Sequence, residues 1–326
     1  MSIYKDSYSD FIINNNNNKN DKNFDIEHLV LPGGGIGGGL LLLGILLELE
    51  KQNKINIKNI NSIYCTSIGS IIGFFILSNV NNISFKYIKK YLHSLDFNKF
   101  DSFKNIPRKI ISSFNNTGIL DITIVKEFLY PFMDKHNIPF DITLKQFHEL
   151  THKSLYIYAT TFDTLQSTEL SYHTFPDMKL IDALYFSSCI VPIFKLLPYI
   201  ENNTNKEYYF IDGGFSNNYP IYPCIQNNIN KTNTILGIHI HSRSYTKQLK
   251  NINIINISTN LLLNIFNKSY FSTQDYDISK YNIHEIFCEI NTTSVYNYEN
   301  LFSTKKIKKF IQKGKIYASF FIKYKL

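Results

Sequence analysis

Cysteine is scarce in this sequence, and the four cysteines stand far apart in the chain, at Cys65, Cys189, Cys224 and Cys288. None of them belongs to a CxxC pair, and no group of histidines at metal-ligand spacing accompanies them. Disulfide-linked small folds and structural zinc sites depend on such patterns. The sequence therefore predicts neither a disulfide framework nor a metal site.

A secretory signal is also missing, because the chain does not open with a basic stretch followed by an apolar core. Residues 29–47 are uncharged and about as long as the roughly 20 residues that cross a bilayer. However, six of the seven residues from Gly33 to Gly39 are glycine, and each glycine weakens a helix by about 1 kcal/mol relative to alanine. We therefore expect no signal peptide and no transmembrane helix, and an intracellular protein that is cytoplasmic or bound peripherally to a membrane.

Acidic residues are outnumbered by basic ones, with 26 Asp and Glu against 34 Lys and Arg, which gives a formal net charge of +8. Such an excess favours anionic partners, either membranes or nucleic acid. The lysines are scattered among Asn and Ile without a recognisable nucleic-acid-binding module. We therefore expect no nucleic acid as a partner and leave peripheral contact with anionic membranes open.

Three regions follow one another along the chain. Residues 1–25 form an Asn-rich tail that is too polar to fold, residues 26–245 alternate apolar strands and helices, and residues 246–326 are expected to form a mainly helical extension, basic at its end. The β-α-β-α opening of the middle region predicts an α/β fold with a mainly parallel sheet and helices on both faces. The expected strands are residues 27–31, 62–65, 155–161, 208–211 and 235–240.

The most distinctive segment is the glycine run that follows the first expected strand. The apolar residues Leu29–Pro32 lead into the run Gly33–Gly39, and a leucine-rich helix begins at Leu40. A strand that turns through glycines into a helix exposes unpaired backbone N–H groups at the positive end of the helix dipole. This turn therefore predicts an anion-binding site.

A dinucleotide is one candidate anion, because Gly33, Gly35 and Gly38 satisfy the G-x-G-x-x-G fingerprint. That fingerprint also expects an acidic residue at the end of the second strand, where this chain has Ile63-Tyr64-Cys65. Glu48 and Glu50 lie earlier, on the connecting helix. A P-loop is disfavoured because no Gly-Lys-Ser/Thr follows the turn. A dinucleotide-binding protein remains an alternative interpretation.

A serine stands where the second strand turns into an apolar helix, in the segment Cys65-Thr66-Ser67-Ile68-Gly69. A serine at such a turn lies at a helix N-terminus, which stabilises an alkoxide, and small neighbours let a substrate carbonyl approach. The pattern G-x-S-x-G is only half present, since Cys65 takes the place of the first glycine. The sequence therefore leaves two interpretations of Ser67: a nucleophile or an ordinary helix N-cap.

An aspartate begins the loop after the strand at residues 208–211, in the segment Asp212-Gly213-Gly214. The two glycines permit a tight turn that can direct the carboxylate across the strand ends, toward the edge that carries Ser67 and the glycine run. A turn aspartate that caps its own loop is the alternative.

Together these segments resemble the patatin-like phospholipase family. The segment Ile181–Phe194, which ends in Pro192-Ile193-Phe194, and the continuation Asn217–Pro220 strengthen the resemblance, which spans residues 27–240. It implies a three-layer α/β fold and a lipid acyl hydrolase of the phospholipase A or lysophospholipase type, without cofactor or metal. It further implies that Ser67 is the nucleophile and Asp212 its proton acceptor, and that an oxyanion hole is formed by Gly33, Gly34, Gly35, Ile36, Gly37 and Gly38. Cys65, Gly69, Gly213 and Gly214 are the supporting motif residues.

Two positions depart from the family pattern. Gly37 stands where family members usually carry Arg or Lys, and Cys65 replaces a glycine. Either change is compatible with a weakly active or inactive lipid-binding protein on the same fold, which we keep as an alternative. The phospholipid or other lipid ester is the expected partner, and the sequence leaves open whether a protein activator is needed.

Two further alternatives concern histidines and the C-terminal segment. His239 and His241 follow Asp212 in the chain, as the histidine of a Ser-His-Asp triad would, but packed or surface histidines are the stronger interpretation. In residues 305–323 the apolar side chains Ile307, Phe310, Ile311, Tyr317 and Phe321 share one helical face, with lysines around the others. This segment is expected either to dock on the core or to bind a membrane, and Gly314 is expected to weaken the helix.

Overall fold

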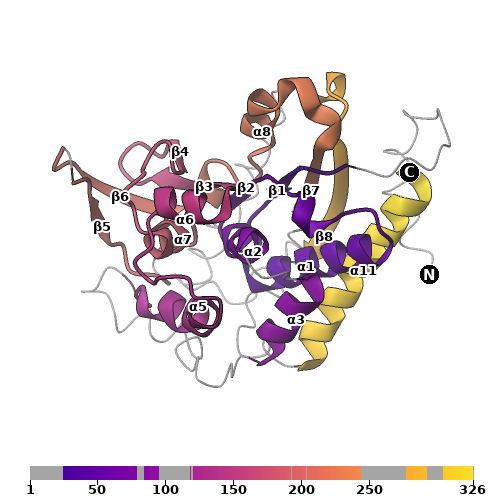
Figure 1. Ribbon diagram of the computed structural model, residues 1–326, viewed down its shortest axis with the longest axis horizontal. Helices are drawn as coiled ribbons and strands as arrows, with labels where there is room; N and C mark the ends of the chain where they lie inside the picture. The colour runs from indigo at the N-terminus through magenta and orange to yellow at the C-terminus, as the bar shows by residue number, and fades with distance from the viewer. Residues whose placement is uncertain are drawn as a thin grey trace, which may run out of the picture.

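The computed structural model describes residues 25–78, 84–94, 118, 120–191, 193–202, 204–243, 277–291 and 304–325. In these residues eight strands form one sheet in the order β5-β6-β3-β2-β1-β7-β8, with β4 paired to β3 (Figure 1). Except for Asp25, the expected Asn-rich tail lies outside the described residues. The strands are β1 (His28–Leu31), β2 (Ser62–Thr66), β3 (Ser154–Thr161), β4 (Ser167–Leu170), β5 (Pro198–Ile200), β6 (Glu207–Asp212), β7 (Ile235–Arg243) and β8 (His284–Asn291).

The centre of the sheet is parallel, as expected. Strands β3, β2, β1, β7 and β8 pair in parallel, whereas β4 and β6 run antiparallel to β3, and β5 antiparallel to β6. The register pairs Leu31 with Cys65 and Thr66 with Tyr158. Because parallel strands end at one edge of the sheet, the turns after β1 and β2 lie beside each other.

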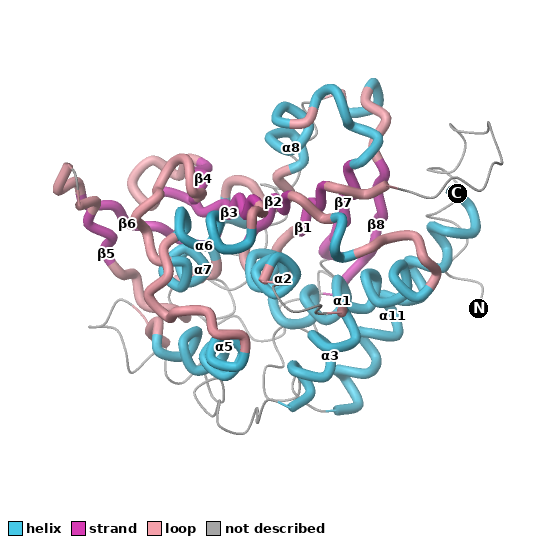
Figure 2. The backbone as a smooth tube through the Cα atoms, in the orientation of Figure 1, coloured by secondary structure: helices cyan, strands magenta, loops and turns pink. Residues whose placement is uncertain are grey.

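Helices cover both faces of this sheet unequally, and Figure 2 shows α8 and short helical segments near it above the strands, while most of the other labelled helices lie below. Side chains alternate between the two faces along each strand. In β2, Ile63 and Cys65 pack into the larger core, whereas Tyr64 packs with Tyr156 and Tyr158 against α8. The main helices are α1 (Gly35–Lys51), α2 (Ile68–Leu77), α3 (Phe85–Ser94), α5 (Thr123–Lys135), α6 (Leu144–Thr151), α7 (Leu180–Ser187), α8 (Ile221–Asn227) and α11 (Thr304–Lys325).

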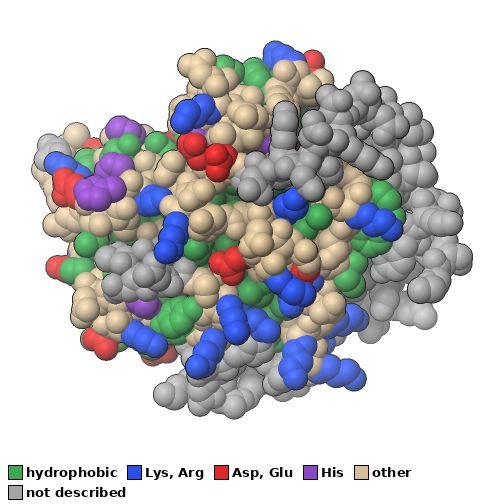
Figure 3. All heavy atoms as spheres, turned by 45° about the vertical axis from the view of Figure 1, so that its right-hand side comes forward, with side chains coloured by type: hydrophobic (Ala, Val, Ile, Leu, Met, Phe, Trp, Pro, Cys, Tyr) green, Lys and Arg blue, Asp and Glu red, His purple; other side chains and the backbone are tan. Residues whose placement is uncertain are grey.

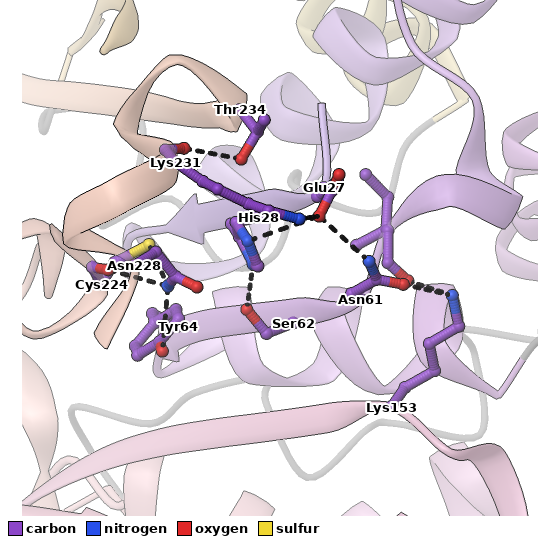
Figure 4. Close-up of polar contacts among 11 residues, drawn as sticks. Glu27, His28, Asn61, Ser62, Tyr64, Lys153, Cys224, Asn228, Lys231 and Thr234 are labelled. Carbon is purple, nitrogen blue, oxygen red and sulfur yellow. Dashed lines mark hydrogen bonds and ion pairs between the residues drawn. The ribbon is translucent and has the colours of Figure 1, made fainter. Parts of the chain in front are cut away.

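A polar network holds the starting edge of the sheet, opposite the turns that follow β1 and β2 (Figure 4). His28 Nδ1 lies 2.7 Å from the hydroxyl of Ser62, and Lys231 Nζ lies 3.4 Å from a carboxylate oxygen of Glu27. Asn61 also donates to the Glu27 carboxylate. These contacts fix the starts of β1 and β2, so that both strands end at defined positions.

The residues beyond 245 that the structure describes continue the same sheet and helical layer. β8 pairs with β7 over its whole length, and α11 packs along α1. The two helices meet at glycines: a Cβ on Gly314 would lie 2.2 Å from the carbonyl oxygen of Leu41, and one on Gly44 2.2 Å from that of Ile311. The expected weak point at Gly314 is therefore a close helix contact inside a continuous helix. The boundary at residue 245 stays a prediction.

Among the described helices, none combines the length and the apolar character that a bilayer span requires.

Candidate active site

Ser67 occupies a strained turn between β2 and α2. β2 ends at Thr66 and α2 begins at Ile68, and Ser67 between them has φ 53° and ψ −128°. A positive φ costs a residue with a Cβ about 1–3 kcal/mol and is retained where the surrounding structure enforces it. The turn lifts the Ser67 side chain out of both elements. This is the geometry that the strand-to-helix pattern of the sequence predicted.

Gly69 allows this turn to press against the end of β1. A Cβ at Gly69 would lie 2.4 Å from the carbonyl oxygen of Leu31 and 2.6 Å from that of Pro32. Cys65, in contrast, is an ordinary buried strand residue whose thiol donates to the Tyr156 carbonyl at 3.4 Å. Its Cβ therefore does not crowd the bend, and burial raises the pKa of its thiol well above the usual value.

Asp212 meets Ser67 at the end of β6. The Ser67 hydroxyl donates a 2.6 Å hydrogen bond to Asp212 Oδ2, and the Gly214 N–H donates a 2.7 Å hydrogen bond to Oδ1. The side chain is buried, with 1% of the residue exposed. Burial raises the pKa of the Asp212 carboxyl to about 7, while the two hydrogen bonds lower it in part. The carboxyl group can therefore accept and release a proton near neutral pH.

Gly213 explains how Asp212 reaches Ser67 although β3 separates their strands. A Cβ at Gly213 would lie 2.1 Å from the carbonyl oxygen of Tyr158 in β3 and 2.9 Å from Thr66 Cγ2. The chain after Asp212 therefore crosses directly over β3, with no space for a side chain. Thr66 closes the contact, since its hydroxyl donates to the carbonyl oxygen of Asn217 at 2.8 Å.

The glycine run forms the turn beside Ser67 and opens α1. Gly34 has φ 154° and Gly35 φ 58°, conformations that favour glycine. A Cβ at Gly33 would lie 3.1 Å from Ser67 Cβ, so the run lies directly against the serine. The N–H of Gly33 donates to Asn218 Oδ1 and that of Gly38 to the Gly34 carbonyl.

Four backbone donors remain at this helix end. Within the described part of the chain, no acceptor is found for the N–H groups of Gly34, Gly35, Ile36 and Gly37, and α1 has no side-chain N-cap. Such a helix end attracts an anion. A Cβ at Gly37 would lie 3.1 Å from side-chain carbons of both Phe310 in α11 and Ile290 in β8, so a larger residue there requires these side chains to shift.

The candidate histidine of a Ser-His-Asp triad and the candidate acidic residue of a dinucleotide site make contacts elsewhere in the structure. The His239 ring packs against Tyr219 and Phe287, with 4.9 Å between ring centroids in both pairs, and burial lowers its pKa to about 3. The Ser67 hydroxyl instead bonds a carboxylate directly. Glu48 is buried in α1 and accepts a hydrogen bond from Gln52. β2 ends in Thr66 rather than in the acidic residue that a dinucleotide ribose requires.

Comparison with known proteins decides the family. The family model described as patatin-like phospholipase matches residues 29–225, which include the glycine run, Ser67 and Asp212. This chain belongs to the patatin-like phospholipase family. Membership makes lipid acyl hydrolysis the general activity of the protein and confirms the resemblance drawn from the sequence motifs.

One sequence relative and one solved structure are similar to this patatin-like protein. It is 29% identical over 241 residues to a probable lipid hydrolase, 463L, of Invertebrate iridescent virus 6, across 71% of this chain and 77% of the viral protein. Its fold is similar to the crystal structure of VipD from Legionella pneumophila, with 16% identity and a TM-score of 0.55, over 92% of this chain and 67% of that one. The three-layer α/β patatin-like fold expected from the sequence is therefore confirmed.

Three residues of this patatin-like site were not anticipated as contacts. Ser187 Oγ, at the end of α7, accepts a 2.8 Å hydrogen bond from the Ser67 N–H, and the Cys189 carbonyl, just after α7, accepts one of 2.9 Å from the Asp212 N–H. Asn218 holds Gly33 as described above. The signals in the sequence were the small residues before the Pro-Ile-Phe segment and the paired asparagines after Asp212, but neither indicates which backbone group it contacts.

Proposed function

We propose that this patatin-like protein is a serine acyl hydrolase that cleaves fatty-acyl esters of lipids, of the phospholipase A or lysophospholipase type. The observation that carries the proposal is the 2.6 Å hydrogen bond from the Ser67 hydroxyl to the Asp212 carboxylate. It joins a serine on a strained turn to a base whose pKa, raised by burial to about 7, suits proton transfer at neutral pH.

In the first half of the reaction, Ser67 Oγ attacks the ester carbonyl carbon as its proton passes to Asp212. The carbonyl oxygen becomes an oxyanion beside the free N–H groups of Gly34, Gly35, Ile36 and Gly37. Donors of this kind lower the barrier most when they are fixed before the charge develops, and one such donor contributes about 3–4 kcal/mol in a serine hydrolase. Asp212 then protonates the leaving alcohol as the carbon–oxygen bond breaks, leaving an acyl-Ser67 ester.

In the second half, water replaces the alcohol. Asp212 accepts a proton from the attacking water, the acyl bond to Ser67 breaks, and the proton returns to Ser67 Oγ. The fatty acid leaves and the original hydrogen bond is restored. No histidine takes part in this scheme, and no metal or cofactor is used.

Contact with an anionic lipid surface is supported by α11. This helix contains eight lysines and no acidic residue, and Lys305 and Lys306 lie in its first turn, where the helix dipole disfavours positive charge. Its outward side exposes Ile316, Phe320 and Tyr324, which are 47%, 50% and 56% exposed. Figure 3 brings forward the side of the molecule on which α11 lies, and Lys and Arg side chains gather in the lower part of that view. A basic helix with exposed apolar residues suits the surface of an anionic bilayer.

Labelling with a fluorophosphonate tests the nucleophile and separates the enzyme from an inactive lipid-binding protein on the same fold. Ser67 Oγ attacks phosphorus, fluoride leaves and the proton passes to Asp212, so only an activated serine is labelled. We expect one adduct on Ser67 and none in Ser67→Ala. Lipid binding without an adduct on the wild-type protein would support the inactive alternative.

A further inference from the structure

A buried hydroxyl lies between the nucleophile turn and the neighbouring strand. The Ser67 N–H donates to Ser187 Oγ at 2.8 Å, and Ser187 Oγ donates to the Tyr158 carbonyl at 2.7 Å. Ser187 is completely buried at the end of α7. One side chain therefore satisfies both a donor of the strained turn and an acceptor of β3.

This bridge stands where the sheet would otherwise continue. β2 pairs with β3 as far as Thr66 and Tyr158, and one more ladder hydrogen bond would join the N–H of Ser67 to the carbonyl of Tyr158. In the structure the Ser67 N–H donates to Ser187 Oγ instead. An unpaired buried N–H and C=O would cost free energy comparable to lost hydrogen bonds. The Ser187 hydroxyl removes that cost at the turn.

The other side of the turn is held from within α2. The Ser67 carbonyl accepts hydrogen bonds from the Ser70 N–H at 2.8 Å and from the Ser70 hydroxyl at 2.6 Å. These bonds fix the peptide that follows Ser67, whereas Ser187 fixes the one that precedes it. The direction of the Ser67 Cα–Cβ bond, and thus the position of Oγ, depends on both peptides.

The same short segment also contacts the second member of the pair. The Asp212 N–H donates to the Cys189 carbonyl at 2.9 Å. Ser187, through its hydroxyl, and Cys189, through its carbonyl, therefore hold Ser67 and Asp212 from one three-residue segment, although 145 residues separate the pair in the chain. A displacement of about 1 Å in a reacting group can lower a rate by about 100-fold.

We propose that Ser187 is a positioning residue for the reaction, one that holds the Ser67 turn so that Oγ points at Asp212. The proposal rests on the proposed function, because it concerns the geometry of the same nucleophile. Ser187 acts through the backbone of Ser67, and its loss affects the chemical step more than lipid binding.

The test compares Ser187→Ala with two matched serine variants. Ser188→Ala removes a neighbouring buried hydroxyl for which the described residues offer no hydrogen-bond partner. Ser78→Ala removes a fully buried hydroxyl that bonds the Phe74 carbonyl, outside the site. Thermal unfolding measures the stability of each variant. Fluorophosphonate labelling rates, and kcat and KM for a short-chain aryl ester, are measured from pH 5 to 9.

We expect Ser187→Ala to lower the labelling rate and kcat by roughly 10- to 100-fold, with KM within about twofold of wild type. The acid limb of its pH profile should also move up by roughly half a unit, because a displaced Ser67 hydroxyl lowers the Asp212 pKa less. Among the residues that the structure describes, the other titratable group beside Asp212 is Cys189, whose pKa burial raises to about 12, so it stays neutral throughout. Ser188→Ala and Ser78→Ala should have the same acid limb of the pH profile, the same labelling rate and the same kcat as the wild-type protein.

Ser187→Cys provides a second variant if Ser187→Ala does not fold, since a thiol fills the site but bonds more weakly. A folded Ser187 variant whose labelling rate and kcat stay within twofold of wild type would overturn this inference but not the proposed function. The inference would also be overturned if Ser188→Ala or Ser78→Ala lowered the rate as much as Ser187→Ala and the acid limb of the Ser187→Ala pH profile did not move. A wild-type protein without an adduct on Ser67 would overturn the proposed function and, with it, the role of Ser187.

Discussion

The hydroxyl of Ser67 and the carboxylate of Asp212 lie 2.6 Å apart, although 145 residues separate them in the chain. Two close backbone approaches make this contact possible. Gly69 lets the Ser67 turn press on the end of β1, and Gly213 lets the chain after Asp212 cross over β3. Glycine is required at both positions because there is no space for a Cβ, and not because the backbone there must be flexible.

The pH dependence of the rate should reflect Asp212. Burial raises the pKa of this carboxyl to about 7, and only the ionised form can accept the Ser67 proton. We therefore expect kcat/KM for a soluble ester to rise with pH through an apparent pKa near 7 and to level off above it. A pH-rate profile measures this directly. A limb centred near pH 4, the usual carboxyl range, would contradict the buried environment of Asp212.

The same carboxyl should make the protein less stable at alkaline pH. Since the folded-state pKa is raised, protonated Asp212 favours the folded state fully below about pH 4, and this contribution is lost as pH rises through about 7. Asp212→Asn removes the buried charge and keeps a carbonyl acceptor for the Gly214 N–H. We expect this variant to be more stable than wild type by about 2–4 kcal/mol at pH 8, with little difference at pH 4. Urea unfolding at both values tests the sign, and equal differences at the two pH values would refute it.

Two glycines near the site should respond in opposite ways to alanine. Gly69→Ala places a Cβ 2.4 Å from the Leu31 carbonyl oxygen, so it should cost several kcal/mol of stability and displace the Ser67 turn. A Cβ at Gly38, within α1, would lie 3.5 Å from Ile240 Cδ1 in β7 and 3.8 Å from the Gly33 carbonyl oxygen, both ordinary contacts, and the Gly38 N–H already donates to the Gly34 carbonyl. Gly38→Ala should leave activity intact and stabilise the protein by up to about 1 kcal/mol. Melting curves with parallel ester assays measure both, and tolerance of Gly69→Ala would show that the approach to β1 is dispensable.

Binding to anionic vesicles should depend on the outward side of α11. Replacing the exposed Lys305, Lys308 and Lys309 by Glu reverses three charges, each worth about 1 kcal/mol near an anionic surface. We expect a loss of binding of more than 100-fold in vesicle co-sedimentation, with unchanged melting. The matched control carries the same change at three exposed lysines on other elements: Lys51, Lys145 and Lys206. Equal losses in both triple variants would indicate a general charge effect and exclude α11 as the contact surface.

The sequence predicted the parallel centre of the sheet because its strands are apolar runs bounded by turns. It missed β4 and β5, which are short and partly exposed, and β8, whose sequence His-Glu-Ile-Phe-Cys-Glu-Ile-Asn is neither a continuous apolar run nor a strict alternation. Glu285 in β8 is tolerated because the Tyr219 hydroxyl, from a distant segment, donates to it at 2.8 Å. A hydrogen-bond partner from a distant segment cannot be predicted from the local sequence pattern of a strand.

The same distinction applies to the site. Ser67, Asp212 and the glycine run were predicted because each sits at a strand end with a recognisable turn. The contacts of Ser187 and Asn218 were not predicted, since a hydroxyl or amide shows its partner only once strands are placed side by side. The surroundings of Gly37 are likewise tertiary, because Phe310 in α11 and Ile290 in β8 come from distant segments.

The central claim is tested most directly by incubating the protein with a panel of phospholipids, lysophospholipids and neutral acylglycerols and measuring released fatty acids by mass spectrometry. The account predicts fatty-acid release by the wild-type protein and by the control His239→Ala, and losses of at least about 1,000-fold in Ser67→Ala and Asp212→Asn. Release that persists in Ser67→Ala, or that disappears in His239→Ala while the variant stays folded, would contradict it.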